Sequence, residues 1–288
     1  MTLTGLEIQQ LAPDDYPIGK KEHGPDFLLS HRHLWIRSQR QWAILKIRTL
    51  IIKSIEDFYR SHEFTKLDTP ILTPNACEGT TELFEIDYFG NPAYLSQSGQ
   101  LYLEAGIMSF GRVYDFEPVF RAEKSKTRRH LIEFWMNNAE MAYCDLYQNI
   151  EIQEKLIMHV LNSVISEGRQ YLDILERDIN PLTNIKAPFP RLTHQQAIQK
   201  LHELGSDIQP NEDLGNDDET ILMTHYQQPV FITHYPAEVK AFYMKRDPQQ
   251  PDRAMCADLL APEGYGEVIG GSQREDDYDI LLASMKKH

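Results

Sequence analysis

The segment 38–62 carries apolar residues at helical spacing. They stand at Trp42, Leu45, Ile52, Ile55 and Tyr59. This period predicts a long amphipathic helix that packs on a sheet. The sequence also predicts a shorter helix over 99–110, a long one over 145–172 with an aspartate N-cap, and a short one over 192–201 with a threonine N-cap.

Strand-like runs fill much of the remaining chain. The runs 113–120 and 131–143 are predicted to form an antiparallel pair joined by a loop. Four further strands are predicted over 227–235, 240–245, 254–260 and 267–271, and the proline-rich stretch 180–190 is predicted to be a loop. Long helices on one side of a mostly antiparallel sheet define an α+β domain, which is the fold class that we predict.

The composition is that of a globular protein with an acidic surface. The chain has 288 residues, of which 41% are hydrophobic and 25% are charged, and its formal net charge is −14. One compact domain with a small insertion fits this length. The negative charge argues against binding nucleic acid through a general basic surface, so any RNA contact must be local.

Three scattered cysteines, Cys77, Cys144 and Cys256, show no metal-ligand spacing. They fit a reduced protein, and we expect a cytoplasmic one. No apolar run approaches the length that spans a membrane, and residues 1–30 lack the features of a signal peptide. We therefore expect no membrane partner.

The loop between the first two predicted strands is strongly basic. Six cationic or potentially cationic side chains lie between Phe120 and Phe134. Arg121 and Glu123 share one strand face, so a guanidinium that binds phosphate stands beside a carboxylate that accepts from an amino group. Phe134 offers a ring for stacking on a base. The hairpin is predicted to bind a nucleoside triphosphate, and the alternative is a solvated basic turn.

This hairpin resembles motif 2 of the class II aminoacyl-tRNA synthetases, which carries F-R-x-E and a later Phe. Other segments resemble further parts of the aspartyl and asparaginyl branch of that family, in the same order. They are 64–73, which resembles motif 1 and contains Pro70; 78–84, which resembles a mobile loop; 94–102, which resembles the amino-acid-binding segment; and 258–275, which resembles a late strand pair.

The resemblance implies a domain organisation. Residues 1–19 resemble the last strand of an anticodon-binding barrel and its hinge, and 20–288 resemble the catalytic domain with a small helical insertion at about 177–226. The barrel itself is not found in the sequence. The position of Pro70 implies a homodimer.

The resemblance also implies ATP and amino-acid sites. The expected ATP-binding residues are Arg121, Glu123, Arg129, His130, Phe134, Asp258 and Glu267, and the expected amino-acid-binding residues are Glu78, Ser96, Gln97, Gln100, Glu104 and Arg274. Glu104 would accept from the NH₂ of a carboxamide while Arg274 donates to its oxygen, which selects asparagine. Glu104 would repel aspartate. The alternative for Glu104 is a solvated helix position.

Asp258 and Glu267 are the expected metal ligands. Two carboxylates on adjacent strands suit Mg²⁺, which takes its other ligands from phosphates and water, although paired acids are more often solvated or salt-bridged. The implied reaction is the ATP-dependent activation of asparagine to an adenylate, followed by transfer to the acceptor end of tRNA. Arg121 and Glu267 are the expected catalytic residues, and they would act by positioning and charge stabilisation.

Two departures from the family pattern bear on activity. The arginine-containing motif 3 is not found after Arg274, and Asn138 stands where the family usually has Glu. We therefore expect reduced activity from this chain. The alternatives are an ATP-dependent asparagine synthetase or amide-activating relative of the same fold, and a non-catalytic binding module.

Overall fold

The computed structural model describes residues 5–11, 13–77, 83–124 and 131–287. The first half of the chain forms the following elements: α1 (Pro25–Ser30), α2 (Arg32–Trp35), α3 (Gln39–Ser61), β1 (Thr65–Lys66), β2 (Leu72–Thr73), β3 (Glu85–Tyr88), β4 (Asn91–Leu95), α4 (Gln100–Phe110), β5 (Arg112–Tyr114), β6 (Glu117–Phe120), β7 (Glu133–Met136) and β8 (Ala139–Met141). The second half forms α5 (Leu146–Glu167), α6 (Arg169–Ile174), α7 (Asn180–Thr183), β9 (Arg191–Thr193), α8 (His194–Glu203), α9 (Asn216–Met223), β10 (Val230–Thr233), β11 (Cys256–Ala261), β12 (Gly266–Ser272) and α10 (Tyr278–Lys287).

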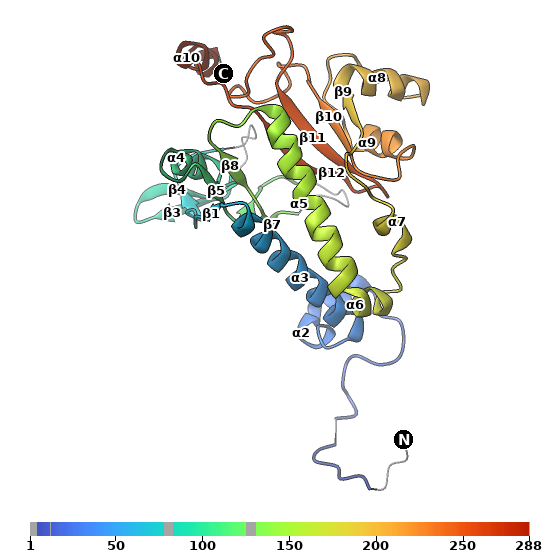
Figure 1. Cartoon of the computed structure of the whole chain (residues 1–288). Coiled ribbons are helices and arrows are strands. Elements are labelled where there is room, and N and C mark those ends of the chain that lie inside the picture. Colours follow the sequence, from blue (N-terminus) through green and yellow to red (C-terminus); the bar gives the residue numbers. More distant parts are fainter. Residues whose placement is uncertain (1–4, 12, 78–82, 125–130, 288) are drawn as a thin grey trace.

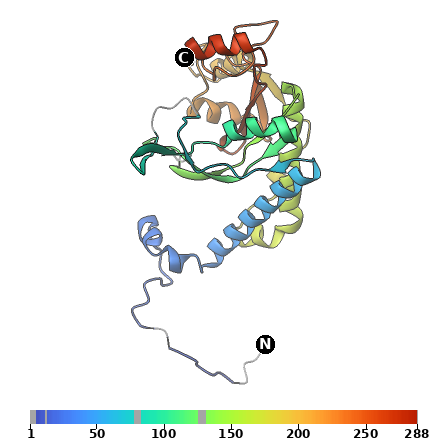
Figure 2. The same ribbon diagram turned by 90° about the vertical axis from the view of Figure 1, so that its left-hand side faces the viewer.

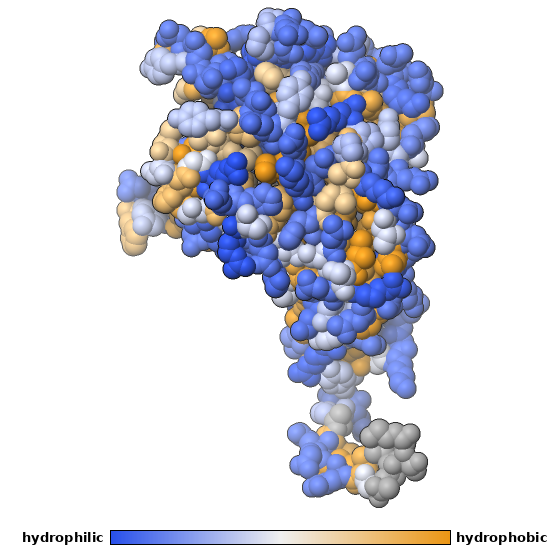
Figure 3. All heavy atoms as spheres, viewed as in Figure 1, coloured by the Kyte–Doolittle hydropathy of each residue, from blue (hydrophilic) through white to orange (hydrophobic). Residues whose placement is uncertain are grey.

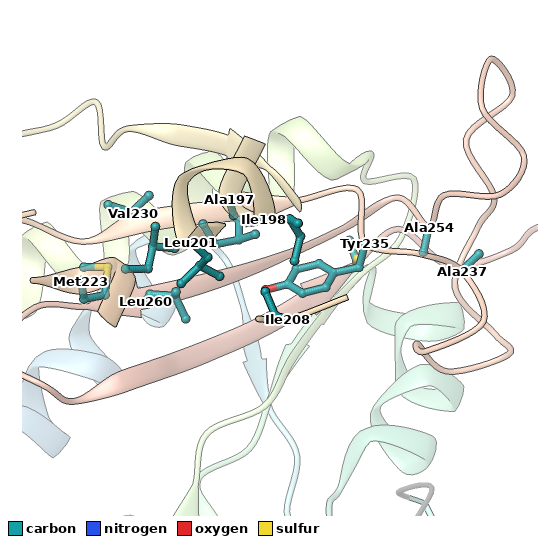
Figure 4. Packing of buried hydrophobic residues seen from close by; sticks show 13 residues of the cluster. Ala197, Ile198, Leu201, Ile208, Met223, Val230, Tyr235, Ala237, Ala254 and Leu260 are labelled. Carbon is teal, nitrogen blue, oxygen red and sulfur yellow. The ribbon is translucent and has the colours of Figure 1, made fainter. Parts of the chain in front are cut away.

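A four-stranded sheet in the order β12-β11-β10-β9 forms the centre of the second half. Its pairs are antiparallel except β9 with β10, which is parallel. One face packs on α5, where Leu146 and Ile150 meet Phe231 and Leu259. The opposite face packs on α8 and α9 (Figures 1 and 4). The alternation of side chains along the strands separates these two apolar layers.

The two long helices pack together beside the smaller sheets. Phe58 and Tyr59 of α3 contact Leu156 of α5 and Tyr114 of β5 in one buried cluster, and the two helices run side by side in both ribbon views (Figures 1 and 2). Strand β5 pairs with β1 and β8, while β6 and β7 form the separate two-stranded hairpin. This packing fixes the hairpin and α4 relative to the four-stranded sheet.

Local capping explains where the predicted helices begin. Ser38 accepts from the backbone N–H of Gln41 at the start of α3, and Asp145 and Thr193 form capping boxes with Gln148 and Gln196. These three predicted starts are confirmed. The predicted helix 145–172 is divided at Gly168, where α5 ends and α6 begins.

Residues 5–11 are exposed and lie outside helices and strands, and the relation of residues 1–19 to a barrel strand and hinge stays a prediction. Two local predictions were wrong. The stretch 240–245 forms turns with a single bridge from Met244 to Arg274. The predicted loop 180–190 contains the short helix α7, in which a proline stands in the first turn.

The outer face seen in the view of Figure 1 is largely hydrophilic, with apolar side chains scattered among polar ones (Figure 3). Within the described ranges, no helix combines the length and the apolar character needed to cross a bilayer.

Candidate amino-acid and nucleotide site

An open cleft of about 2190 Å³ lies between the hairpin, α5 and the four-stranded sheet. It brings together residues that the sequence analysis proposed from distant segments: Gln100, Arg121, Glu123, Phe134, Asp258, Glu267 and Arg274. Three expected site residues, Glu78, Arg129 and His130, lie outside the described residues. The cleft is therefore the place where the predicted amino-acid and nucleotide residues meet.

Arg274 lies at one end of this cleft against two carboxylates. Its Nε is 3.3 Å from Glu104 Oε1 and its Nη2 is 2.7 Å from Glu140 Oε1. The guanidinium also lies over the ring of Tyr243, 4.8 Å from the ring centroid, and donates to the hydroxyl of Ser272. Charge, stacking and a fork of donors thus fix the orientation of Arg274.

Glu104 is held from the other side by Gln100. Gln100 Nε2 donates to Glu104 Oε1 at 2.9 Å, and Tyr243 Oη donates to Gln100 Oε1 at 3.3 Å. Since Tyr243 also stacks on Arg274, these four side chains form a closed ring of contacts. The ring presents a carboxylate and a guanidinium side by side, which matches the donor and acceptor ends of a carboxamide.

Ser96 and Gln97 are buried at 4% and 2% exposure. Ser96 Oγ donates to the carbonyl of Ser98, and Gln97 Oε1 accepts from the backbone N–H of Cys77. The backbone of Ser96 bonds to Ile71 and Phe120, so this segment joins the small sheets to the hairpin. Their predicted role in binding the α-ammonium group stays a prediction.

The opposite end of the cleft is rich in carboxylates. Asp258 is buried, and its Oδ2 lies 2.8 Å from Lys240 Nζ, which also reaches Asp213 at 3.2 Å. Glu267 comes from the neighbouring strand, and the backbone N–H of Glu267 donates to Glu219. Lys240 further lies 3.9 Å from the ring centroid of Tyr235. Several carboxylates thus gather near one lysine.

These carboxylates influence one another. Removal from water, followed by the charge of Asp258, raises the pKa of Glu267 from its ordinary value to about 8. Burial likewise raises the pKa of Asp258, while Lys240 opposes the rise. A Cβ placed on Gly270 would lie 2.7 Å from Glu267 Oε1 and 3.6 Å from Asp258 Oδ1, so both carboxylates converge at this glycine.

The donor set at this end fits Mg²⁺. Within the described part of the chain, no group of three or more His, Cys, Asp or Glu side chains is arranged to hold a metal ion by itself. Magnesium needs only one or two protein carboxylates when phosphates and water complete its shell. A bound divalent cation would offset the repulsion between these converging oxygens and lower the raised pKa of Glu267.

Arg121 and Phe134 lie together at the hairpin. The guanidinium carbon of Arg121 is 5.6 Å from the centroid of the Phe134 ring, and the backbone N–H of Arg121 donates to Ile132. Strands β6 and β7 are in register from Glu117 with Met136 to Phe120 with Glu133. The predicted strand pairing is confirmed here, and Glu123 lines the same cleft.

Sequence reasoning missed three residues of this site. Glu140 and Tyr243 hold Arg274, and Lys240 neutralises Asp258. Glu140 stood beside the Asn138 departure but received no role, and Lys240 and Tyr243 lay in a stretch predicted to be a strand. The only signal in the sequence was that each of these residues is polar and stands in a short stretch beside a recognised motif.

Comparison with known proteins places this geometry in a family. The sequence pattern of the tRNA synthetases class II (D, K and N) matches residues 24–288. The fold and the cleft are therefore those of a class II aminoacyl-tRNA synthetase, and the chain belongs to this family.

The relatives narrow the type of enzyme. The asparagine-tRNA ligase of Desulforamulus reducens is 53% identical over all of this chain and 67% of its own length. An asparaginyl-tRNA synthetase structure from Pyrococcus horikoshii, complexed with asparaginyl-adenylate, superposes with a TM-score of 0.94 at 40% identity and covers 98% of this chain and 65% of its own. One from Entamoeba histolytica, also with asparaginyl-adenylate, gives 0.86 at 32% identity, covering 96% of this chain and 62% of its own.

The chain corresponds to the catalytic region of an asparagine-tRNA ligase. It spans about two thirds of the length of the relatives that it matches.

Proposed function

We propose that this chain binds asparagine and ATP in the cleft and forms asparaginyl adenylate. The observation that carries the proposal is the Glu104–Arg274 pair, fixed by Gln100 and Tyr243. Glu104 accepts from the carboxamide NH₂, and Arg274 donates to the carboxamide oxygen. Aspartate presents a second carboxylate to Glu104, which disfavours its binding.

The chemical step joins two bound substrates. A carboxylate oxygen of asparagine attacks the α-phosphorus of ATP, the bond from that phosphorus to the bridging oxygen breaks, and pyrophosphate leaves. Arg121 neutralises charge that develops on the α-phosphate, and Glu123 and Phe134 hold the base. Arg129 and His130 of the basic loop contact the outer phosphates. No proton is removed by a side chain, so positioning supplies the rate.

Asp258 and Glu267 would hold Mg²⁺ at the acidic end of the cleft. When bound, the ion supplies charge neutralisation for the phosphates of ATP. Lys240 pairs with Asp258, so the carboxylate cluster is already partly compensated. The adenylate is then passed to a ribose hydroxyl at the acceptor end of tRNA, in line with the ligase names of the relatives.

We further propose a homodimer and a two-part organisation of the chain. Ile71 and Leu72, next to Pro70, are 44% and 40% exposed, as is expected of apolar side chains covered by a second copy. Residues 20–288 form the catalytic domain, with the helical insertion at about 177–226, and residues 1–19 lead into it. Light scattering at micromolar concentration tests the dimer, and a monomeric mass would contradict it.

The activity test is pyrophosphate exchange into ATP, measured with asparagine and with aspartate. We expect exchange with asparagine and little with aspartate. Glu104→Gln should raise the KM for asparagine and narrow this preference, whereas Glu203→Gln on the exposed end of α8 should change neither.

Exchange that depends on aspartate alone would favour the asparagine synthetase alternative. An absence of ATP binding would favour a non-catalytic module.

A further inference from the structure

Asp115 is a fully buried carboxylate at the junction of the small sheets. Its exposure is 0%, and a Cβ on Gly99 would lie 1.9 Å from its Oδ2. The carboxylate therefore lies directly against the backbone where α4 begins, and only glycine fits at position 99. A buried carboxylate is costly unless it is hydrogen-bonded, so its hydrogen-bond partners decide whether the site is stable.

Asn138 supplies those hydrogen bonds. Its backbone N–H donates to Asp115 Oδ1 at 3.0 Å, and its Nδ2 donates to Oδ1 at 3.0 Å and to Oδ2 at 3.3 Å. Burial, against these hydrogen bonds, raises the pKa of Asp115 to about 6, with a smaller contribution from the charge of Glu117. The side chain of Thr69 also stabilises the charged form, to a smaller extent. The carboxylate is thus charged at neutral pH, and Asn138 is its main hydrogen-bond donor.

The charge on Asp115 gives the amide of Asn138 one orientation. An ionised carboxylate only accepts, so it takes the NH₂ end and leaves Asn138 Oδ1 toward Ser98. Ser98 Oγ donates to that oxygen at 3.3 Å and accepts from the backbone N–H of Gln100 at 3.1 Å. Ser98 therefore caps the first turn of α4, where the N-cap residue is a glycine without a side chain.

The hydrogen-bond chain ends at the backbone N–H of Gln100, and this contact places the residue whose side chain reaches the amino-acid pocket. Gln100 is the first residue of α4, and its side chain holds Glu104 and receives the hydroxyl of Tyr243. Each link from Asp115 to Glu104 has a defined donor. A reversal at Asn138 would present NH₂ to Ser98 and remove the acceptor that Ser98 needs.

We propose that Asp115 and Asn138 are a positioning pair, whose fixed hydrogen-bond direction through Ser98 orients Gln100 and Glu104 to receive asparagine. This inference rests on the proposed function. It also gives the departure at Asn138 a structural meaning, because an acid at position 138 would face the buried carboxylate of Asp115.

The test uses Asp115→Asn, Asn138→Asp and the double variant that exchanges the two residues. In Asp115→Asn two amides face each other, so either direction of hydrogen bonding becomes possible, and in Asn138→Asp two carboxylates face each other, so the link is lost. In the double variant the amide now at position 115 can donate to the carboxylate now at position 138. The second oxygen of that carboxylate accepts from Ser98, so the direction is restored. Asn162→Asp, exposed on α5, is the control for an added charge.

Binding of asparagine and of ATP is measured separately by calorimetry. We expect each single variant to weaken asparagine binding by about 10- to 100-fold, which is the effect of losing a buried hydrogen bond. The ATP affinity should change by less than about twofold, which is less than the effect of one such bond. The double variant should recover asparagine affinity to within about threefold of the starting protein and be more thermostable than either single variant.

Two results would overturn the inference alone: unchanged asparagine affinity in Asn138→Asp, or parallel loss of both ligands without recovery in the double variant, which indicates a purely structural role. If the unaltered chain binds ATP but not asparagine, the proposed function fails, and the positioning role fails with it. If the double variant is less thermostable than both single variants, the pairing itself is wrong.

Discussion

The two ends of the cleft differ in the balance between their carboxylates and their cations. At the amino-acid end, Arg274 is matched by Glu104 and Glu140 and oriented by Tyr243. At the acidic end, the carboxylates of Asp213, Glu219, Asp258 and Glu267 outnumber their neighbour Lys240. At the first end two carboxylates face one guanidinium, a surplus of one, so this is the more balanced end before a neutral side chain arrives. At the second end the surplus of negative charge is larger, and a cation would compensate it.

This contrast matches the chemistry of the two proposed ligands. A carboxamide carries no charge, so its recognition needs a prearranged donor and acceptor whose own charges cancel locally. ATP brings several negative charges together with a metal ion. Carboxylates that repel one another in the absence of the ion would be stabilised when it binds. The raised pKa of Glu267 is the measurable sign of that state.

Removing the guanidinium of Arg274 from the amino-acid end should have the largest effect on stability. Arg274→Ala leaves Glu104 and the nearly buried Glu140 without their partner, and the loss of such partly buried charge-assisted bonds costs about 1.5–3 kcal/mol of unfolding free energy. Chemical denaturation measures this loss, and asparagine binding should disappear with it. Arg169→Ala, which removes an exposed pair with Asp173, should cost less than about 1 kcal/mol. Equal losses in the two variants would show that Arg274 does not hold a partly buried network.

Arg121 is a reference cation outside both ends. Arg121→Ala should lower asparagine-dependent adenylate formation by about 10²–10³-fold, because a donor to developing phosphate charge is lost. Calorimetric asparagine affinity should stay unchanged, since the Arg274 ring of contacts is intact. The loss of one such donor lowers a rate by much more than about threefold. A rate within about threefold of that of the unaltered chain would therefore contradict a contact between Arg121 and the phosphate.

The pH dependence of stability in Glu267→Gln tests the surplus negative charge at the acidic end of the cleft. Because the folded-state pKa of Glu267 lies above its ordinary value of 4.5, at about 8, the folded chain holds a proton that the unfolded chain releases. Stability should therefore fall as pH rises from about 5 to 8. Because burial also raises the pKa of Asp258, Glu140 and Asp115, the variant should keep a smaller pH dependence. It should melt a few degrees higher, about 2–4 °C, at pH 8. Thermal melts at pH 5 serve as the internal control, where the two proteins should agree.

Millimolar Mg²⁺ should raise the melting temperature of the unaltered chain at pH 8 and not that of Glu267→Gln. A pH dependence of unchanged size in the variant would assign the titration to another group.

Gly270→Ala should have the smallest effect. The new methyl group meets Glu267 Oε1, the end of a flexible side chain, so that side chain moves and the stability loss stays below about 1 kcal/mol. The Mg²⁺-dependent rise in melting temperature should shrink, while asparagine affinity is kept. Gly19→Ala, which meets no atom within 4 Å, is the matched control. Reduced asparagine binding in Gly270→Ala would mean that the two ends are not independent.

Local signals account for most of what the sequence predicted well. The starts of α3, α5 and α8 are set by neighbouring cap residues, and the β6–β7 pairing follows from two runs that adjoin the basic loop. Tertiary pairing accounts for the failures. The stretch 240–245 has strand-like composition, yet Lys240 is held by Asp213 and Asp258, so its backbone follows ion pairs instead of a sheet.

The site shows the same division. Arg121, Asp258 and Arg274 were found because each lies in a recognisable segment, and the structure brings them to one cleft. Glu140 and Asp115 were not assigned roles, because their importance comes from partners far along the chain. Single-sequence patterns carry no information on which distant carboxylate meets which donor.

The spacing of the pocket residues along the chain has a consequence for folding. Gln100 and Tyr243 are 143 residues apart, and Glu140 and Arg274 are 134 apart. Such contacts close large loops and form late, after locally paired hairpins and helices. During synthesis the proposed asparagine pocket cannot assemble until Arg274 has left the ribosome, even though the β6–β7 hairpin is already complete. Asparagine binding therefore shows that β12 and the residues directly after it have folded onto the sheet.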